Sequence, residues 1–130
     1  MNRKLKGTTA ERDLVHKFWA LNGWVACRIA GSGSMRYPSP DIIAGNYKKC
    51  LAIECKNCSS DIQYLTKKEI SELLHFADKL KAEPWIAVKF SSTDWIFIHP
   101  VNLKKTDGEN YAIKREERSI WGKTMEELIN

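Results

Sequence analysis

Two carboxylates and a lysine stand at a spacing that could serve phosphodiester hydrolysis. Glu54 and Lys56 lie two positions apart in the apolar run 50–56. If that run is a strand, its side chains alternate, so Glu54 and Lys56 share one face with Cα atoms about 7 Å apart. Asp41 begins a second apolar run after Pro40. Pairing of the two runs would bring its carboxylate beside Glu54 at one sheet edge.

Two neighbouring carboxylates repel each other, and a divalent cation relieves that repulsion. Mg²⁺ prefers oxygen ligands, usually one or two carboxylates with waters and phosphate oxygens. Such an ion can polarise a phosphoryl oxygen and activate water. Lys56 could orient or deprotonate that water, or compensate charge in the transition state. Glu11 could supply a further ligand, directly or through water. These residues predict a metal-dependent nuclease site.

The same residues have a structural interpretation that the motif alone does not exclude. Glu-x-Lys on a strand is commonly a solvent-facing ion pair, and an aspartate after proline is commonly a turn residue. Glu11 could be an acid at a helix start, stabilised by the helix dipole. From the residues alone, both interpretations stay open.

The elements that must position these residues can be read from the hydrophobic pattern. Thr8 or Thr9 could cap a first helix that ends at Asn22-Gly23. A strand is expected over 24–29, and a Gly-, Ser- and Pro-rich loop over 30–40. The following strands, 41–45 and 50–56, are joined by a tight turn at 45–49.

The second half of the chain continues with a helix over 66–81 and strands over 85–90 and 95–98. Beyond Pro100 we expect a polar loop, a strand near Tyr111 and a short helix over 123–129. This order predicts an α/β fold with a central sheet flanked by helices.

Composition and charge narrow the class of protein. The 130 residues are 43% hydrophobic and 28% charged, which suits a single domain spanning 1–130. Neither a membrane-length apolar run nor a signal-like start is present in the sequence, so a cytoplasmic location without membrane association is expected. Residues 1–56 hold ten Lys and Arg against four acids, a balance that would attract a polyanion such as nucleic acid but that a merely solvated surface could also have. We expect no small-molecule substrate.

Four cysteines occur without a zinc-like arrangement, although Cys55 and Cys58 form a C-x-x-C pair. A second pair at suitable spacing is lacking, and His75 and His99 do not complete a site. We expect reduced thiols, with Cys27 and Cys55 as buried strand residues.

Several segments resemble the archaeal Holliday junction resolvases of the Hjc type. Pro40-Asp41 and Glu54-Cys55-Lys56 are similar to the PD-(D/E)xK nuclease signature. The similar segments are 9–14, 27–32, 41–46, 52–56, 87–90 and 95–98. They place the core of the nuclease domain at about 3–100 and leave the role of the tail 101–130 uncertain. The resemblance implies a restriction-endonuclease-like fold, with a central mixed sheet of about five strands. It also implies a homodimer that cuts four-way DNA junctions with Mg²⁺, or with Mn²⁺ in its place.

Residue roles follow from that resemblance. It implies catalytic positions at Glu11, Asp41, Glu54 and Lys56, with the three acids as metal ligands, and a site role for Ser32. Two departures leave questions: the loop 33–40 is longer than expected, and the tail beyond Pro100 matches poorly. The residues that we expect to contact DNA are Arg3, Lys4 and Lys6, as a basic arm, together with Arg12 and Arg28.

The expected second helix suggests a subunit interface. Its apolar stripe suits packing on the sheet, whereas Phe76 lies to one side of that stripe. Phe76 could pack under the C-terminal tail. The resemblance instead places Phe76 and Leu80 between two subunits, which would give the two active sites that paired incisions need. Two other functions stay open: a different duplex DNA or repair endonuclease, and a non-catalytic nucleic-acid-binding module.

Overall fold

A five-stranded sheet forms the centre of the molecule. The computed structural model describes residues 3–31 and 36–130, with the backbone alone for 3–6. The sheet order is β1-β2-β3-β5-β6, with β3 and β5 parallel and the other neighbours antiparallel. The strands are β1 (Val25–Arg28), β2 (Ile42–Gly45), β3 (Cys50–Cys58), β5 (Glu83–Phe90) and β6 (Ile96–Ile98). The predicted mixed sheet of about five strands is confirmed.

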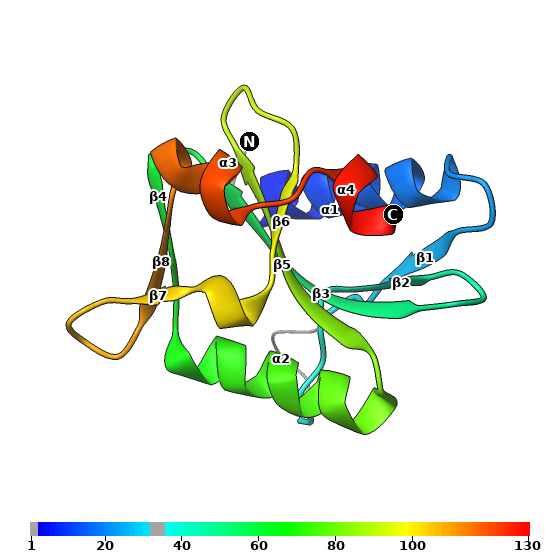
Figure 1. Ribbon diagram of the computed structural model, residues 1–130, viewed down its shortest axis with the longest axis horizontal. Coiled ribbons are helices and arrows are strands. Elements are labelled where there is room, and N and C mark those ends of the chain that lie inside the picture. The colour runs from blue at the N-terminus through cyan, green and yellow to red at the C-terminus, as the bar shows by residue number, and fades with distance from the viewer. Residues whose placement is uncertain (1–2, 32–35) are drawn as a thin grey trace.

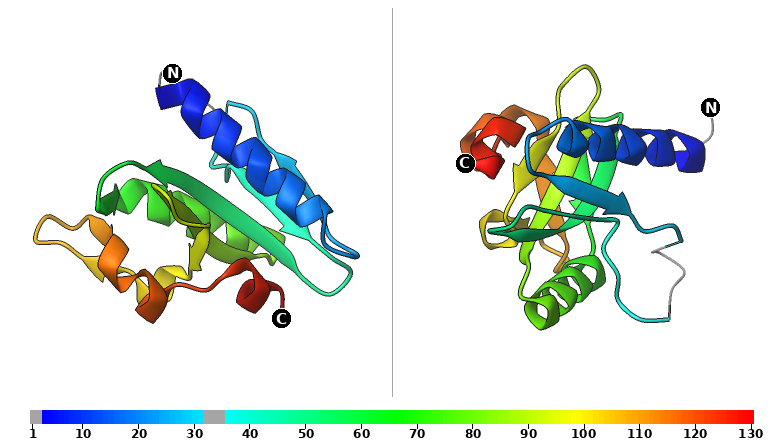
Figure 2. Two further views of the ribbon diagram at one scale, coloured as in Figure 1. Left: turned by 90° about the horizontal axis from the view of Figure 1, so that it is seen from above. Right: turned by 90° about the vertical axis from the view of Figure 1, so that its right-hand side faces the viewer.

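Helices cover both faces of this sheet (Figures 1 and 2). Helix α1 (Arg3–Trp19) buries Leu14 and Phe18 in one cluster, and α2 (Lys67–Leu80) buries Leu73 and Ala77 in a second. The sheet supplies Ile53 to the first cluster and its neighbour Ala52 to the second, because successive side chains point to opposite faces. The sheet therefore separates two apolar cores.

Local sequence signals fix the elements next to the candidate site. The Asn46 amide oxygen accepts the backbone N–H groups of Lys48 and Lys49 at 2.9 Å, which closes the predicted turn between β2 and β3. Thr66 caps α2, and Lys81 ends it in the left-handed conformation with φ 61°. The predicted helix over 66–81 is thereby confirmed.

The C-terminal tail and a strand that precedes α2 form a second, three-stranded sheet in the order β4-β8-β7. Its strands are β4 (Ile62–Leu65), β7 (Lys104–Lys105) and β8 (Tyr111–Lys114). The strand near Tyr111 was predicted, whereas β4 was not. The remaining elements are the 3-10 turns Pro100–Asn102 and Arg115–Glu117, and the helices α3 (Arg118–Trp121) and α4 (Met125–Ile129). Leu128 of α4 is buried in the cluster under α1, so the tail is part of the core.

Two local expectations were wrong. Helix α1 begins at Arg3 and runs through Thr8 and Thr9, so neither threonine is its N-cap. A glycine within a helix costs only about 1 kcal/mol, and Gly7 does not stop this one. Cys27 is exposed, because the neighbouring Ala26 occupies the buried face of β1. None of the helices in the described ranges is long and apolar enough to cross a membrane.

Candidate active site

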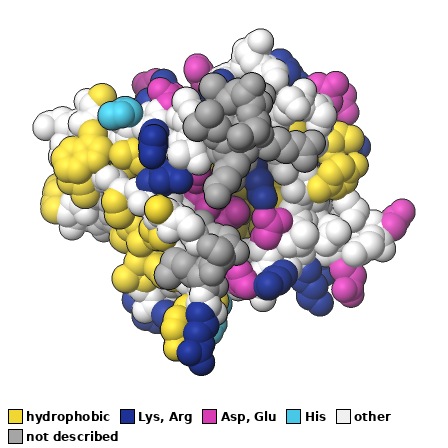
Figure 3. Space-filling model, turned by 180° about the vertical axis from the view of Figure 1, so that it is seen from behind, with side chains coloured by type: hydrophobic (Ala, Val, Ile, Leu, Met, Phe, Trp, Pro, Cys, Tyr) yellow, Lys and Arg dark blue, Asp and Glu magenta, His cyan; other side chains and the backbone are white. Residues whose placement is uncertain are grey.

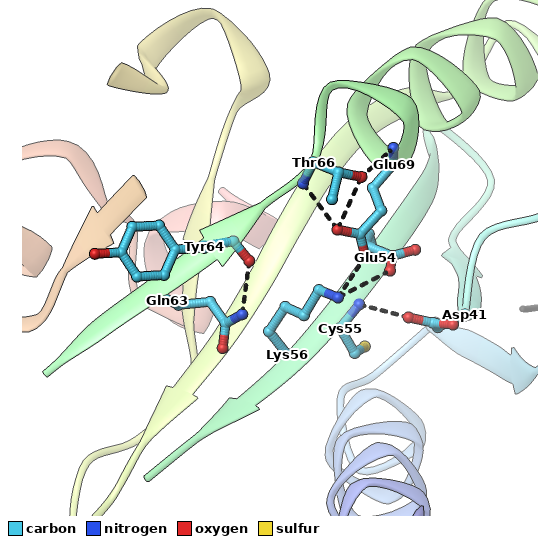
Figure 4. A network of polar contacts seen from close by, with 8 residues as sticks. All are labelled: Asp41, Glu54, Cys55, Lys56, Gln63, Tyr64, Thr66 and Glu69. Atoms are coloured by element: carbon cyan, nitrogen blue, oxygen red, sulfur yellow. Dashed lines mark hydrogen bonds and ion pairs between the residues drawn. The ribbon is translucent and has the colours of Figure 1, made fainter. Parts of the chain in front are cut away.

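Asp41 is held between two strands at the entrance to β2. Its backbone N–H donates to the carbonyl of Ile53 at 3.0 Å, and its carbonyl accepts the N–H of Ile29 at 2.8 Å. The β2–β3 register pairs Ile42 with Ile53, and one further step sets Asp41 opposite Glu54. The Asp41 carboxylate accepts the backbone N–H of Cys55 at 2.8 Å (Figure 4). The sequence expectation that Asp41 lies beside Glu54 agrees with this arrangement.

Glu54 and Lys56 project from the α2 face of β3. The intervening Cys55 points to the other face, where it packs against the cluster under α1. The Lys56 ammonium group lies 3.9 Å from a Glu54 carboxylate oxygen and also pairs with Glu69 of α2. Lys56 is therefore bracketed by two carboxylates (Figure 4).

Burial and charge perturb each of these groups. Burial, followed by the charge of Asp41, raises the pKa of Glu54 from 4.5 to about 8. Burial lowers the pKa of Lys56, but the hydrogen bond and charge of Glu69 outweigh it, so the net pKa of Lys56 is raised. Burial raises the pKa of Glu69, but its hydrogen bonds with Lys56 and Thr66 prevail and lower it. The ammonium form of Lys56 is thus favoured, and a second negative charge beside Asp41 is disfavoured.

Glu11 approaches Asp41 from α1, on the other side of the sheet. Burial and then the Asp41 charge raise its pKa, which Arg28 opposes. The Arg28 Nε lies 3.6 Å from a Glu11 carboxylate oxygen, and its Nη2 donates to the Thr8 hydroxyl at 3.4 Å. Asp41 therefore has acidic neighbours on two sides, Glu54 and Glu11. Within 3–31 and 36–130, however, no three His, Cys, Asp or Glu side chains form a group that could hold a metal ion.

A pocket of about 250 Å³ opens between α2 and the sheet, where β2 begins beside the central strand β3. Its lining among the described residues is Ser39, Asp41, Glu54, Lys68, Glu69, Glu72 and Leu73. Figure 3 shows carboxylate side chains near the middle of this side of the molecule, with lysine and arginine side chains around them. Of the four carboxylates that line the pocket, Glu69 pairs with Lys56 and Glu72 with Lys68, whereas Asp41 and Glu54 lie beside each other.

The donor set around Asp41 fits a divalent ion such as Mg²⁺. Carboxylate oxygens are the ligands that this ion prefers. The raised pKa of Glu54 indicates that charge on both carboxylates is costly, and a bound cation would offset that cost. Asp41 and Glu54 could hold such an ion, whereas Glu11 interacts with Asp41 from α1.

The remaining predicted site residues either lie outside the described part of the chain or do not line the pocket. Ser32 lies outside the described residues. The basic residues Arg3, Lys4 and Lys6 belong to the first turns of α1 rather than to a separate arm, and their side chains are outside the description. Arg12 is exposed on α1, and Arg28 is engaged with Glu11.

Sequence reasoning missed two residues of this site, Ser39 and Glu69. Ser39 lines the pocket one position before Pro40. Glu69 could have been noticed, because Thr66-x-x-Glu69 has the spacing of a capping box at a helix start. That pattern predicts the cap, but it does not predict that the carboxylate also reaches Lys56.

Comparison with known proteins identifies the family. The model of the family described as "Archaeal holliday junction resolvase (hjc)" matches residues 2–130. The chain belongs to this family. The resemblance noted in the sequence is thereby confirmed, and the match includes the tail beyond Pro100.

Individual resolvases of the family show the same relationship. The crossover junction endodeoxyribonuclease Hjc of Archaeoglobus fulgidus is 40% identical over 110 residues, covering 85% of this chain and 79% of that protein. The Hjc of Methanocaldococcus jannaschii is 33% identical over 115 residues, covering 88% and 80%. A solved structure of A. fulgidus Hjc, titled a Holliday junction resolvase from an archaeal hyperthermophile, superposes with a TM-score of 0.86. That structure is 35% identical, and the match covers 93% of this chain and 96% of that one. The expected restriction-endonuclease-like fold is confirmed, because this chain and the A. fulgidus Hjc structure share it.

Proposed function

We propose that this chain is a structure-selective, divalent-metal-dependent endonuclease that resolves four-way DNA junctions by paired phosphodiester hydrolysis. The observation that carries the proposal is the grouping of Asp41, Glu54 and Lys56 where β2 begins beside the central strand β3, in a chain of the archaeal Holliday junction resolvase family. Its relatives are named crossover junction endodeoxyribonucleases. We further propose that residues 1–130 act as one nuclease domain, in the cytoplasm, on DNA of the nucleoid.

Asp41 and Glu54 are proposed to hold the metal ion, with Mg²⁺ the preferred ion and Mn²⁺ a substitute. Glu11, which is near Asp41 from the α1 side, is proposed to assist through water. When bound, the ion supplies charge stabilisation at the scissile phosphate and activates water for attack. Glu54 must lose its proton before it can serve as a ligand, so its pKa of about 8 links ion binding to pH.

Lys56 is proposed to donate hydrogen bonds to the scissile phosphate and to compensate its developing charge. Of the roles considered from the sequence, this one is favoured by the raised pKa of Lys56, because a protonated amine cannot accept a proton from water. Its position between Glu54 and Glu69 supports the role, since charge stabilisation depends on donors that are already in place.

DNA contacts are proposed for the basic residues of the N-terminal half. Arg12 follows Glu11 on α1 and is exposed, so it can reach a phosphate beside the site. Arg28 could contribute only while it also holds Glu11. We keep Arg3, Lys4 and Lys6 as phosphate contacts from the start of α1, and Ser32 as a site residue. Because phosphate contacts carry no base readout, binding should depend on junction shape and on salt.

A homodimer is proposed as the functional unit, with Phe76 and Leu80 at its interface. Phe76 is half-buried against the cluster under α2, whereas Leu80 stays 47% exposed and Leu74 43% exposed. Exposed leucines on one helix suit a partner surface. A twofold pair would present two active sites to the two related strands of a four-way junction.

The decisive experiment compares a labelled four-way junction with a linear duplex of the same sequence. Mg²⁺-dependent cutting of the junction, at least about ten times faster than cutting of the duplex, supports the proposal. Equal cutting of both substrates would favour another PD-(D/E)xK duplex or repair endonuclease. Binding without product under Mg²⁺ or Mn²⁺ would instead favour a non-catalytic nucleic-acid-binding module.

A further inference from the structure

The Glu69 carboxylate faces two parts of the molecule at once. One oxygen, Oε1, accepts the backbone N–H of Thr66 at 2.9 Å and its hydroxyl at 3.3 Å. The other oxygen, Oε2, accepts from the Lys56 ammonium group (Figure 4). A single side chain thus joins the start of α2 to Lys56 on β3.

The Thr66 contacts hold Glu69 in place independently of Lys56. The Glu69 backbone N–H donates to the Thr66 hydroxyl at 3.0 Å, which completes a capping box. In a capping box the glutamate side chain is bent back toward the helix start by its bond to the N-cap backbone. The direction of Oε2 is therefore set by the helix cap, so Lys56 meets an acceptor that is already oriented.

Lys56 needs such an acceptor because its aliphatic side chain is flexible and does not by itself hold the ammonium group in one position. A lysine has a flexible four-carbon side chain and behaves as a mobile point charge. Its other ion pair, with Glu54, is longer at 3.9 Å, and Glu54 is also a proposed metal ligand. An anchor that takes no part in metal binding would keep Lys56 in position through the reaction.

We propose that Glu69 is a positioning residue, which holds the Lys56 ammonium group beside Asp41 and Glu54 and so ties catalytic geometry to the cap of α2. This inference rests on the proposed function, in which Lys56 acts on the scissile phosphate. Glu69 does not itself contact the substrate. Its effect on the reaction is exerted through the position of Lys56. Misplacing a catalytic group can lower the rate about 100-fold.

Glu72 provides a matched comparison one turn further along α2. It lines the same pocket, but its ion pair is with the exposed Lys68 at 3.9 Å rather than with Lys56. Glu69→Gln and Glu72→Gln therefore remove the same charge from the same pocket. Only the first removes an acceptor from Lys56. Glutamine also serves in capping boxes, so Glu69→Gln leaves the start of α2 capped.

The test measures single-turnover cleavage of a four-way junction under Mg²⁺, together with junction affinity. We expect Glu69→Gln to lower the rate constant about 10- to 100-fold while affinity changes less than about 3-fold. Glu72→Gln should stay within about 3-fold of the parent in both. Thr66→Ala controls for stability, because it weakens the cap yet leaves the Glu69 carboxylate. It should lower the melting temperature more than Glu69→Gln does and lower the rate less, because the backbone N–H at position 66 still holds Oε1.

A second measurement does not depend on cleavage. Proton exchange of the Lys56 ammonium group with water, followed by NMR in lysine-labelled protein, should accelerate in Glu69→Gln and stay unchanged in Glu72→Gln. Loss of the signal in Lys56→Met assigns the resonance. A merely structural role for Glu69 would alter stability without a selective change at Lys56.

The outcomes separate this inference from the function it rests on. If the parent cuts the junction and Glu69→Gln cuts equally fast, the positioning role is wrong and the proposed function stands. Equal losses in Glu69→Gln and Glu72→Gln would also overturn it, because pocket charge would then explain both. If the parent does not cut, the proposed function fails and the inference falls with it.

Discussion

The Asp41 carboxylate lies 2.8 Å from the backbone nitrogen of Cys55, which donates a hydrogen bond to it. This bond ties the residue before β2 to the residue that follows Glu54 on β3. It uses one oxygen of Asp41 to fix the carboxylate, at the point where the two strands set Asp41 opposite Glu54. Two acids that are 13 positions apart in the chain thus become neighbours whose charges interact.

Removing charge from either acid should abolish cutting without abolishing binding. We expect Asp41→Asn and Glu54→Gln to lower junction cleavage at least about 100-fold, because each loses a proposed metal ligand. Junction affinity should be kept or increase, since neither substitution adds negative charge near DNA. Cleavage assays and gel shifts measure the two quantities. Asp61→Asn, an exposed acid before β4, should behave as the parent does. A variant that cuts near the parent rate would place its residue outside the site.

The stability of the metal-free protein should fall as pH rises from about 5 to 8. Burial, then Asp41, raises the folded-state pKa of Glu54 to about 8, above its ordinary value of 4.5. The folded protein therefore holds a proton that the unfolded chain has released. The stabilisation is full below pH 4.5 and is lost as pH rises through 8, with a slope of at most about 1.4 kcal/mol per pH unit.

Unfolding in denaturant at several pH values, with a chelator present, measures this slope. Glu54→Gln should flatten the dependence and should be the more stable protein at pH 8. Glu11, whose pKa is also raised, leaves a smaller slope of the same sign. Equal slopes in the parent and Glu54→Gln would show that Glu54 does not hold the proton.

Mg²⁺ should stabilise the folded protein, and more strongly at pH 8.5 than at pH 6. An ion that binds only the folded state adds about 1.4 kcal/mol at ten times its Kd. At pH 6 the ion must first displace the Glu54 proton, which weakens binding. Thermal melting with matched NaCl controls measures the effect, which should nearly vanish in Asp41→Asn. A shift that is independent of pH would argue against Glu54 as a ligand.

Leu80→Glu should convert the proposed dimer to a monomer without unfolding the chain. Leu80 is 47% exposed in one subunit, so a charge there is tolerated in the monomer, but it would be costly inside an interface. Light scattering should give twice the 15.0 kDa chain mass for the parent and a single chain mass for the variant. The variant should nick junctions rather than cut them in pairs. Ile120→Glu, at a 66% exposed position of α3, is the control. A dimeric Leu80→Glu would place the interface elsewhere.

The elements nearest the candidate site were predictable because their signals are local. The turn at 45–49, the alternation along β3 and the spacing of α2 each depend on residues close in the chain. An antiparallel hairpin fixes register through its turn, so the neighbourhood of Asp41 and Glu54 followed from the same signals. The start of α1 was not predictable, because Thr8 and Thr9 look like caps although the helix passes through them.

The sequence by itself determined which residues could do chemistry: two carboxylates and a lysine on paired strands, with resemblance to a nuclease family. Only the tertiary structure decided how they are held. It lets Glu11 of α1 interact with Asp41, brings Glu69 to Lys56, and pairs β4 with β8 across about fifty residues. The physical reason is that strand alternation and helix caps depend on residues that are neighbours in the sequence. Contacts between a helix and a sheet depend instead on the packing of the whole chain.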